Sequence, residues 1–453
     1  MSMFVLIALV AAEVALVVMT CTKCSEKPEW RRNRVLVRLM ETALVFGMVL
    51  LPTTHMKWRF LIALIVLMFR FLIAGISWLA RRKKTGTRKK LWTVVNCVFS
   101  VILIAFTLIP SFVFSNYNGL PTTGEYSVSE VSGILVDSSR KDPFENDGSF
   151  REVPVHFYYP ETDSAGSNAF PLILFSHGAF GYYQSNFTTY MELASHGYVV
   201  AALDHPHHSF FTKDTAGKTV IVDTDFINDV MDINEEGVTN EQIFTLSQDW
   251  LKIRIADEAF ALDCMERAKM RKSLDAAWHT DNEETIIKIL AMTDTDKIGL
   301  MGHSLGGASS VTLARQRTDI DTVVDLDGTM LGEIVAVENG KNVYNEEAYT
   351  VPVLEFMKEM DYTEREQYKK ENGMPYVNEF VMAHAENGKT VVFENVGHMD
   401  FTDLPLISPT LANMLGHGDI DSEEFLTMMN EIILDWFDYT LKGEGTLDIQ
   451  AKY

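Results

Sequence analysis

Long apolar segments dominate the first quarter of the chain. Four of them, with few or no charged residues, cover residues 4–19, 35–51, 60–79 and 91–114. A bilayer core about 30 Å thick is crossed by roughly 20 apolar residues in helical form. The last two segments are the most apolar, and the second is the least. We therefore predict a region of about four transmembrane helices over residues 1–114.

The first apolar segment could instead belong to a cleaved signal peptide over residues 1–25. A signal peptide begins with a basic stretch, but no Lys or Arg precedes Lys23. The positive charges follow the apolar run, which is typical of an anchor whose N-terminus faces outward. The pattern favours a retained helix.

Lys and Arg residues are distributed unevenly among the loops. Five lie within residues 23–34 and seven within residues 81–90, whereas only Lys57 and Arg59 separate the second and third segments. Because loops rich in Lys and Arg stay on the cytoplasmic side, the last segment should run outward. This predicts a multi-pass protein of the cell membrane, with the remaining chain on the extracytoplasmic side.

Charged residues interrupt the apolar segments at Glu13, Arg38, Glu41 and Arg70. An unpaired charge at membrane depth is costly. These residues could serve transport or sensing, but we favour the interpretation that they pair within a small bundle.

Beyond a polar linker over residues 115–127, short apolar runs alternate with helical patterns, which predicts one domain over residues 128–453. The predicted strands cover residues 153–159, 172–176, 198–203, 297–303, 322–326, 351–356 and 391–396, and the clearest helices cover 253–269, 307–315 and 423–441. Several strands are apolar almost throughout, as parallel strands covered on both faces are. The pattern predicts an α/β fold, with a mostly parallel sheet between two layers of helices.

An acidic stretch over residues 210–250 interrupts this alternation. A long excursion of this kind can form a lid or a substrate wall. It can equally be a solvated insertion, and the sequence leaves both interpretations open.

The two regions differ in charge. Residues 1–117 hold 16 Lys and Arg against 4 Asp and Glu, whereas the whole chain carries −23, so residues 118–453 carry about −35. An acidic domain repels nucleic acid, and we expect no nucleic-acid partner. Cys21 and Cys24 form a CxxC pair without a second pair of ligands nearby, so we expect no metal or redox site.

The pentapeptide Gly302-His-Ser304-Leu-Gly306 matches the GxSxG pattern. A predicted strand precedes it and a helix of small residues follows it, which is the context of a nucleophilic serine in an α/β-hydrolase fold. The flanking glycines leave room for a sharp turn, and the helix N-terminus directs free N–H groups toward developing negative charge. We predict Ser304 as the nucleophile.

A serine hydroxyl needs a base to accept its proton. His398 follows the last predicted strand in a Gly-His turn, whereas His384 precedes that strand and His417 lies well beyond it. We therefore predict His398 as the base.

The acid that orients the base is less sharply defined by the pattern. Asp327 directly follows the strand at 322–326, Asp325 lies within it, and Glu355 and Asp361 lie one strand later. All four keep the chain order of serine, acid and histidine.

An oxyanion hole needs two backbone N–H donors near the serine. Leu305 should supply one, and Ala179 the other, from the turn after the early strand at 172–176. We expect His177 to brace that turn rather than to act as a second base.

Several separated segments resemble the plasma-type platelet-activating-factor acetylhydrolase family. They are Gly124-Glu-Tyr-Ser-Val, Phe157-Tyr-Tyr-Pro, Pro171-Leu-Ile-Leu-Phe-Ser-His-Gly, Leu193-Ala-Ser-His-Gly-Tyr-Val-Val-Ala-Ala, Gly302-His-Ser-Leu-Gly-Gly-Ala, His398-Met-Asp-Phe-Thr-Asp and Gly418-Asp-Ile-Asp-Ser. They cover most of residues 120–443 in order, and the apolar N-terminal segments lie outside them.

The resemblance implies Ser304 as nucleophile, Asp327 as acid and His398 as base, with Ala179 and Leu305 as oxyanion donors. It also implies calcium-independent cleavage of short or oxidised sn-2 acyl chains from phospholipids. We thus expect a serine ester hydrolase that acts on a lipid or small ester substrate without a cofactor. The alternatives are a general carboxylesterase or acyltransferase with the same triad, and a non-catalytic membrane sensor.

Overall fold

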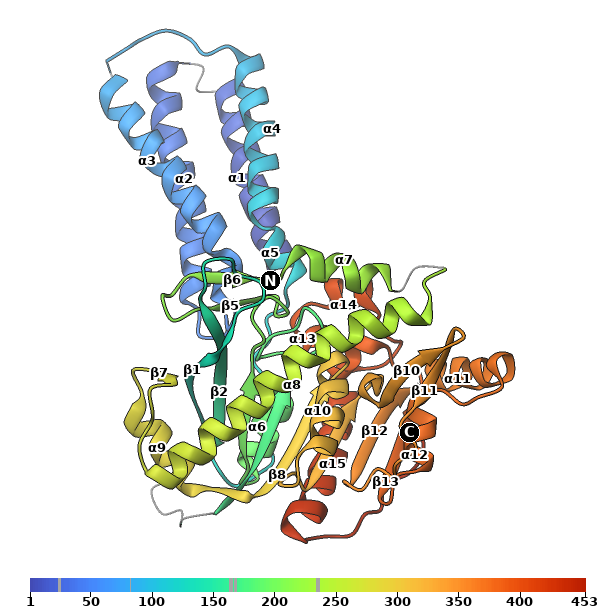
Figure 1. Cartoon of the computed structure of the whole chain (residues 1–453). Helices are drawn as coiled ribbons and strands as arrows, with labels where there is room; N and C mark the ends of the chain where they lie inside the picture. The colour runs from blue at the N-terminus through green and yellow to red at the C-terminus, as the bar shows by residue number, and fades with distance from the viewer. Residues whose placement is uncertain (23–25, 82, 163–165, 167–168, 234–236) are drawn as a thin grey trace. The chain divides into compact units, whose positions relative to one another are not determined.

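The computed structural model describes residues 1–22, 26–81, 83–162, 166, 169–233 and 237–453 (Figure 1). Some residues considered above lie outside this part of the chain: Lys23, Cys24, Arg82, Glu235 and Glu236. The chain divides into two compact units. The first contains Met1–Asn118 and Pro405–Met414, and the second contains Gly119–Leu404 and Leu415–Tyr453.

The first unit is helical. Its helices are α1 (Ser2–Thr22), α2 (Lys27–Leu50), α3 (Leu61–Arg81), α4 (Lys90–Thr107), α5 (Ile109–Val113), most of α13 (Leu404–Ile407) and most of α14 (Pro409–Leu415), with a 3₁₀ turn at Lys57–Phe60. Three helices of the described chain are long and apolar enough to cross a membrane: Ser2–Thr22, Lys57–Arg81 and Lys90–Thr107. The least apolar of the four predicted segments forms α2, whose first half is basic and which is not among those three.

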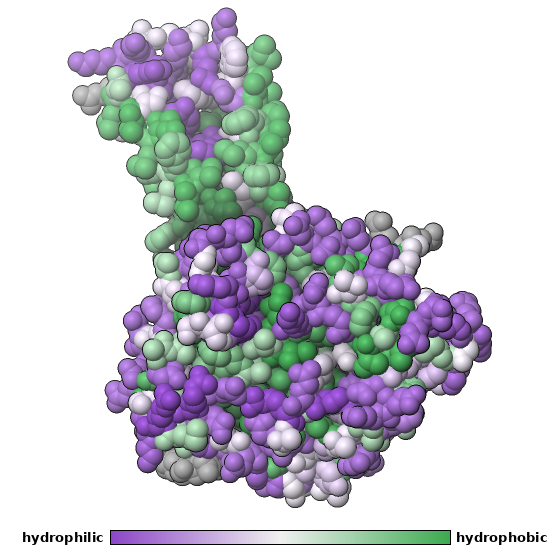
Figure 2. Space-filling model, viewed as in Figure 1, coloured by the Kyte–Doolittle hydropathy of each residue, from purple (hydrophilic) through white to green (hydrophobic). Residues whose placement is uncertain are grey.

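Apolar side chains lie both inside and outside this unit. Val5, Leu9, Phe60 and Leu67 are buried between helices, whereas side chains such as Phe69 are exposed. Figure 2 shows the resulting apolar surface along the helices, with polar side chains gathered over the loops at one end. An apolar surface of this extent is typical of contact with lipid or with another apolar partner.

The charges within the apolar segments are paired, which confirms that prediction. Arg38 lies 2.6 Å from Glu13 and 2.7 Å from Glu41. Arg70 Nη2 lies 2.5 Å from the same Glu13 carboxylate and donates to Ser100. Salt bridges thus join α1, α2 and α3.

Part of the later chain belongs to this helical unit. The N–H of Ser115 donates to the carbonyl of Ile407 (2.8 Å), and Ser408 Oγ donates to the carbonyl of Val113 (2.8 Å). The sequence pattern did not predict this association, because residues 405–414 are short and only partly apolar.

A nine-stranded sheet forms the centre of the second unit (Figure 1). In spatial order its strands are β13 (Gly388–Phe393), β12 (Val353–Lys358), β9 (Thr322–Leu326), β8 (Thr293–His303), β3 (Phe170–Ser176), β4 (Val199–Leu203), β2 (Phe150–Pro160), β1 (Val128–Lys141) and β7 (Trp278–His279). Pairing is parallel from β13 to β4, and β2, β1 and β7 continue the sheet in antiparallel pairing. The predicted mostly parallel sheet is therefore confirmed.

Helices cover both faces of this sheet. They are α6 (Phe187–Ser195), α8 (Asn240–Arg271), α9 (Glu283–Met292), α10 (Leu305–Gln316), α11 (Glu359–Asn372), α12 (Val377–Ala383) and α15 (Ser422–Phe437). α8 and α10 pack together on one face, and α6 and α15 pack together on the other. β3, β4 and β9 are buried along their whole lengths between these layers, which explains why they are mostly apolar, with Asp325 of β9 as a buried exception.

Two strands differ from the sequence-based expectation. β1 is an outer antiparallel strand whose residues alternate between exposed and buried, so it has no continuous apolar run to mark it. β13 ends at Phe393 instead of Val396, because Asn395 has a φ of 59° and cannot continue an extended strand.

The excursion over residues 210–250 has structure of its own. It contains a short hairpin, β5 (Phe211–Lys213) and β6 (Thr219–Ile221), then α7 (Thr224–Asp232) and the first turns of α8. The Asp223 side chain accepts hydrogen bonds from two N–H groups at the start of α7 and so caps it. A second hairpin, β10 (Ile334–Glu338) and β11 (Lys341–Tyr344), follows β9.

Candidate active site

Ser304 occupies the turn between β8 and α10. Its φ of 54° and ψ of −122° lie outside the regions that non-glycine residues favour, so the backbone is strained here. Its N–H donates to the carbonyl of Leu326 at the end of β9 (2.9 Å). The turn therefore holds the serine at the carboxyl edge of the parallel sheet, as the GxSxG pattern predicts.

Close packing explains the glycines beside this serine. A Cβ at Gly302 would lie 2.2 Å from the carbonyl carbon of Gly306, and a Cβ at Gly306 would lie 2.0 Å from the carbonyl oxygen of Ser176. Neither position has room for a side chain. The sharp turn thus depends on both glycines.

Asp327 and His398 meet at the same edge of the sheet. His398 Nδ1 lies 2.6 Å from Asp327 Oδ2, and the two residues follow β9 and β13. The ring of His303, next to the serine, lies 4.5 Å from the His398 ring and hydrogen-bonds to its carbonyl. Among the described residues no hydrogen bond joins Ser304 Oγ to this imidazole, as is common before substrate binds.

Asp327 is an almost fully buried carboxylate. Burial alone would raise its pKa, but the hydrogen bond from His398 and the positive charge of Lys358, 3.7 Å away, hold the pKa below its ordinary value. The carboxylate therefore stays ionised and can stabilise a positive imidazolium.

The other three candidate acids are engaged elsewhere. Asp325 accepts a hydrogen bond from the N–H of Gly328, and burial raises its pKa well above its ordinary value, which suits a structural group. Glu355 accepts hydrogen bonds from Arg365, Asn378 and Thr390, and Asp361 pairs with Lys358. Of the four, Asp327 is the one bonded to His398.

Ala179 and Leu305 lie close together in one apolar cluster. Neither backbone N–H is used in a turn, loop or cap hydrogen bond of the described chain. Leu305 is the first residue of α10, where a helix has free N–H groups. A Cβ at Gly178 would lie 3.2 Å from Ser304 Cβ, so the Ala179 turn packs directly against the serine.

His177 braces this turn, as expected. Its Nδ1 lies 2.7 Å from the carbonyl oxygen of Gly178, and its Nε2 lies 2.8 Å from Ser209 Oγ. Burial, with the neighbouring charge of Arg254, lowers the pKa of His177 well below its ordinary value. A buried, neutral and doubly bonded imidazole is poorly suited to be a second base.

Arg254 is a residue that the sequence reasoning missed. Its fully buried guanidinium donates to the carbonyls of His177 and Gly178 (3.3 Å to the latter), and so fixes the turn that carries Ala179. The available signal was a charged residue on the apolar face of the predicted helix at 253–269.

A buried polar chain continues from Arg254 along α8. Asp257 accepts hydrogen bonds from Arg151 (2.7 Å) and His205 (3.0 Å). Ser176 and Ser309 link His205 to Glu258, whose pKa burial raises to about 7. This polar chain runs beneath the turn that carries Ala179 and beneath α10, and it rigidifies both.

His384 and His417 take structural positions. His384 Nδ1 lies 2.7 Å from the carbonyl of Phe380 at the end of α12. His417 pairs with Asp400, which also accepts hydrogen bonds from the N–H groups of Gly397 and Gly418. Asp400 thereby holds the loop that presents His398.

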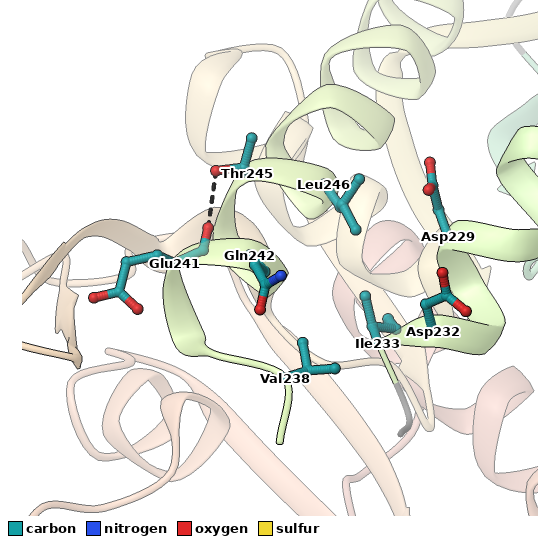
Figure 3. A pocket seen from close by; sticks show the side chains of 8 residues that line it. All are labelled: Asp229, Asp232, Ile233, Val238, Glu241, Gln242, Thr245 and Leu246. Atoms are coloured by element: carbon teal, nitrogen blue, oxygen red, sulfur yellow. Dashed lines mark hydrogen bonds between the residues drawn. The ribbon is translucent and has the colours of Figure 1, made fainter. Parts of the chain in front are cut away.

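The 210–250 excursion packs beside the oxyanion turn. The Phe226 ring of α7 stacks on His208 (3.9 Å between centroids) and contacts the rings of Phe180 and Trp250. Outside this anchor, α7 and α8 border a pocket of about 500 Å³ (Figure 3). It is lined by Asp229, Asp232, Ile233, Val238, Glu241, Gln242, Thr245 and Leu246. In the described chain, no group of three or more His, Cys, Asp or Glu side chains could hold a metal ion.

Comparison with known protein families gives one match over residues 153–446, to the family described as platelet-activating factor acetylhydrolase, isoform II. The chain belongs to this family. The matched region contains the serine turn, the Asp327–His398 pair and the oxyanion turn, and it leaves the helical N-terminal region outside. The resemblance expected from the sequence is confirmed.

Individual relatives are distant. The chain is 22% identical over 275 residues to a platelet-activating factor acetylhydrolase of Bos taurus, which covers 58% of this chain and 56% of the relative. It is 23% identical over 315 residues to a probable 1-alkyl-2-acetylglycerophosphocholine esterase of Arthroderma benhamiae, covering 63% and 65%. A platelet-activating factor acetylhydrolase of Canis lupus familiaris is 26% identical over 172 residues, or 36% of each chain. The chain thus spans about one third to two thirds of the length of these relatives.

A solved structure supports the fold. The chain resembles a ferulic acid esterase from Streptomyces cinnamoneus with a TM-score of 0.52 at 19% identity, over 73% of this chain and 95% of the other. At this identity the likeness concerns the architecture, and it agrees with an α/β-hydrolase fold.

Proposed function

We propose that this chain is a membrane-anchored serine ester hydrolase that cleaves short or oxidised sn-2 acyl chains from phospholipids. The observation that carries the proposal is the 2.6 Å hydrogen bond between His398 and Asp327 beside a serine in a strained strand-to-helix turn. A carboxylate, an imidazole and a hydroxyl at one sheet edge suit acyl transfer through a covalent intermediate.

In the first step, His398 Nε2 accepts the proton of Ser304 Oγ as the oxygen attacks the ester carbonyl. Asp327 holds Nδ1–H and stabilises the imidazolium that forms. The N–H groups of Ala179 and Leu305 receive the oxyanion. His398 then gives its proton to the leaving lysophospholipid oxygen, and an acyl-Ser304 ester remains.

In the second step, His398 accepts a proton from water, which attacks the acyl-Ser304 carbonyl. The same two amides stabilise the second oxyanion. Collapse of the intermediate releases the carboxylic acid and returns the proton to Ser304 Oγ. These steps use only side chains and amides of the chain.

Two observations support a short acyl group. The Arthroderma relative is named for esterase activity on a 1-alkyl-2-acetylglycerophosphocholine. The aromatic side chains of Phe180, Phe226 and Trp250 fill the space beside the oxyanion turn, which limits the room for a long chain. We assign this part of the 210–250 excursion as a substrate wall.

The same proposal includes a membrane anchor. The apolar helices α1, α3 and α4 cross the bilayer, and α2 crosses with them because Arg38 and Glu41 neutralise each other. The basic stretch at residues 23–34, which includes the start of α2, and the loop at residues 81–90 then lie on the cytoplasmic side, and the catalytic unit lies outside.

Labelling with a fluorophosphonate probe tests the nucleophile in the full chain. We expect wild type and Ser310→Ala to be labelled, because Ser310 is a buried serine further along the same helix. Ser304→Ala should lose the label. Intact labelling of Ser304→Ala would rule out the proposed nucleophile.

A substrate panel tests the proposed specificity. We expect rapid hydrolysis of an sn-2-acetyl phospholipid, slow hydrolysis of its sn-2-palmitoyl analogue, and dependence of both on Ser304. Preference for simple nitrophenyl esters over both lipids would instead favour a general carboxylesterase, and acyl transfer to added alcohols would favour an acyltransferase.

Cysteine accessibility in intact cells tests the topology. In a background without the native cysteines, Thr85→Cys in the basic loop should be protected from an impermeant maleimide. Ser273→Cys, exposed after α8, should react. The reverse pattern would contradict the proposed orientation.

A further inference from the structure

The helical unit contains a partly open cavity of about 380 Å³ that the proposed catalysis does not use. Side chains from all four long helices, and from the loop before α4, line it. The charged residues among them are Glu13, Arg34, Arg38, Arg70 and Arg88. The lining therefore has an excess of three positive charges, in a cavity of a size that holds small ligands.

The arginines of this cavity differ in how far they are neutralised. Arg38 is held by both Glu13 and Glu41. Arg70 is only half engaged: Nη2 bonds to Glu13 and Ser100, whereas Nη1 is buried without an acceptor among the described residues.

Arg34 has still fewer partners. Its Nε and Nη2 atoms are both buried without an acceptor in the described chain, and so is Nε1 of Trp30. The Trp30 ring lies close to two guanidinium groups, 4.9 Å from that of Arg34 and 3.6 Å from that of Arg88. The ring orients these cations, but it offers no acceptor for their N–H groups.

Unpaired buried donors on cations are costly. Salt bridges explain the burial of Glu13, Arg38 and Glu41. They also account for Nη2 of Arg70. They leave four N–H-bearing atoms on Trp30, Arg34 and Arg70 without acceptors, and two cations without carboxylates. Water could satisfy the donors, but it would not neutralise the charge.

We propose that this cavity binds a phosphate group, supplied by the headgroup of an anionic phospholipid or by free inorganic phosphate. A phosphate has three or more acceptor oxygens in a tetrahedral arrangement, so it can bond to donors that converge from several helices. Arginine binds phosphate oxygens with its planar fork of donors, which a carboxylate or a single-atom anion would fill less completely. The site does not depend on Ser304 chemistry.

Binding is measured with the purified full chain. In one arm, inorganic phosphate is titrated into protein in neutral detergent, with sulfate-free and phosphate-free buffer as reference. In the other, the chain is placed in nanodiscs of phosphatidylcholine with or without phosphatidic acid, and retained lipid is counted by native mass spectrometry. We expect saturable binding in at least one arm, and the arm that responds identifies the source of the phosphate group.

Single substitutions locate the site. Arg34→Gln and Arg70→Gln should each weaken binding at least tenfold, since a hydrogen bond to a charged group is lost. Arg32→Gln is the matched control, because Arg32 is exposed on the same helix, and its affinity should equal that of wild type. Glu13→Gln should strengthen binding, because it removes the carboxylate that competes for Arg38 and Arg70.

Circular dichroism of the helices would reveal an arginine variant that fails to fold. In that case the expected gain in affinity of Glu13→Gln still tests the proposal. Absence of phosphate binding by wild type in both arms would overturn the proposal. Equal affinity of wild type, folded Arg34→Gln and Glu13→Gln would also overturn it. Loss of fluorophosphonate labelling at Ser304 would bear on the hydrolase alone.

Discussion

Both units bury arginines, and Arg151 and Arg254 of one unit differ from Arg34 and Arg70 of the other in how completely their guanidinium groups are bonded. In the sheet-containing unit, every guanidinium nitrogen of Arg151 and of Arg254 has an acceptor: carboxylates and a carbonyl for Arg151, and carbonyls and a histidine nitrogen for Arg254. In the helical unit, Arg34 and Arg70 keep buried N–H groups without an acceptor in the described chain. The first arrangement is complete as it stands, and the second leaves room for an anion.

The difference matters for how each unit uses its charge. A fully bonded buried network holds backbone in one arrangement, as Arg254 holds the oxyanion turn. A partly bonded network would be stabilised by a ligand that supplies the missing acceptors. Substitution of a single charged group in the sheet-containing unit should therefore cause a large loss that added anion does not restore. In the helical unit, the effect of such a substitution should depend on added anion.

The largest effect should follow from Asp327→Asn. The amide can still hydrogen-bond to His398, but it favours the wrong tautomer and cannot stabilise the imidazolium, so kcat should fall by about 10⁴-fold. The measurement is hydrolysis of an sn-2-acetyl phospholipid. Asp361→Asn, which removes a carboxylate bonded to Lys358 but not to His398, is the control and should retain most activity. An equal loss in both variants would contradict the role of Asp327.

Asp257→Asn should cost about 3–5 kcal/mol of unfolding free energy, because it breaks a fully buried ion pair and leaves Asp142 as the carboxylate that faces Arg151. Thermal unfolding of the full chain in detergent measures it. Asp319→Asn is matched to it, since Asp319 forms a 2.7 Å pair with Arg317 in a partly exposed position. That change should cost less than about 1 kcal/mol. Similar costs for both would mean that the Arg151 pair is no more than a surface contact.

The fold and the catalytic edge followed from the sequence because both depend on local signals. Buried parallel strands need uninterrupted apolar residues, and the serine turn needs Gly302 and Gly306. Asp327 was left among four carboxylates by the pattern, because choosing it requires knowing which strand end lies beside His398. Arg254 and Asp257 could not be paired with their partners from the sequence, since those partners lie on distant strands and loops.

The helical unit shows the same limit. Pairing of Glu13, Arg38, Glu41 and Arg70 could be expected from the cost of burying charge. The packing of residues 405–414 with the N-terminal helices could not, because it rests on main-chain contacts such as that of Ser115 with Ile407. The sequence also could not predict which arginine N–H groups remain without acceptors.

Glu13→Gln directly tests the difference between the buried arginines of the two units. It should destabilise the full chain in phosphate-free detergent, and phosphate at 100 times its dissociation constant should restore about 2.7 kcal/mol. Phosphate should stabilise Asp257→Asn only as much as it stabilises wild type, because both keep the same helical cavity. Thermal unfolding of the three proteins at one phosphate concentration measures the gains. An equal gain in all three would mean that the Glu13 carboxylate does not compete with phosphate for the arginines.

The last effect we predict is a pH dependence from Glu258. Burial raises the pKa of this carboxyl from its ordinary value near 4.5 to about 7, so the folded chain binds more protons than the unfolded chain between these values. The stabilisation is therefore complete below about pH 4.5 and is lost as pH rises through 7, with a total of up to about 3 kcal/mol. Oε2 of Glu258 lacks an acceptor or donor in the described chain, which suits a protonated oxygen. In thermal unfolding between pH 5 and 8, Glu258→Gln should show a smaller decline in stability with pH than wild type. Burial also raises the pKa of Asp403 to about 7, so the part of the decline that comes from Asp403 should remain in that variant. An unchanged slope in Glu258→Gln would show that Glu258 is already ionised in the folded chain, and that the buried network carries a negative charge beside Ser309.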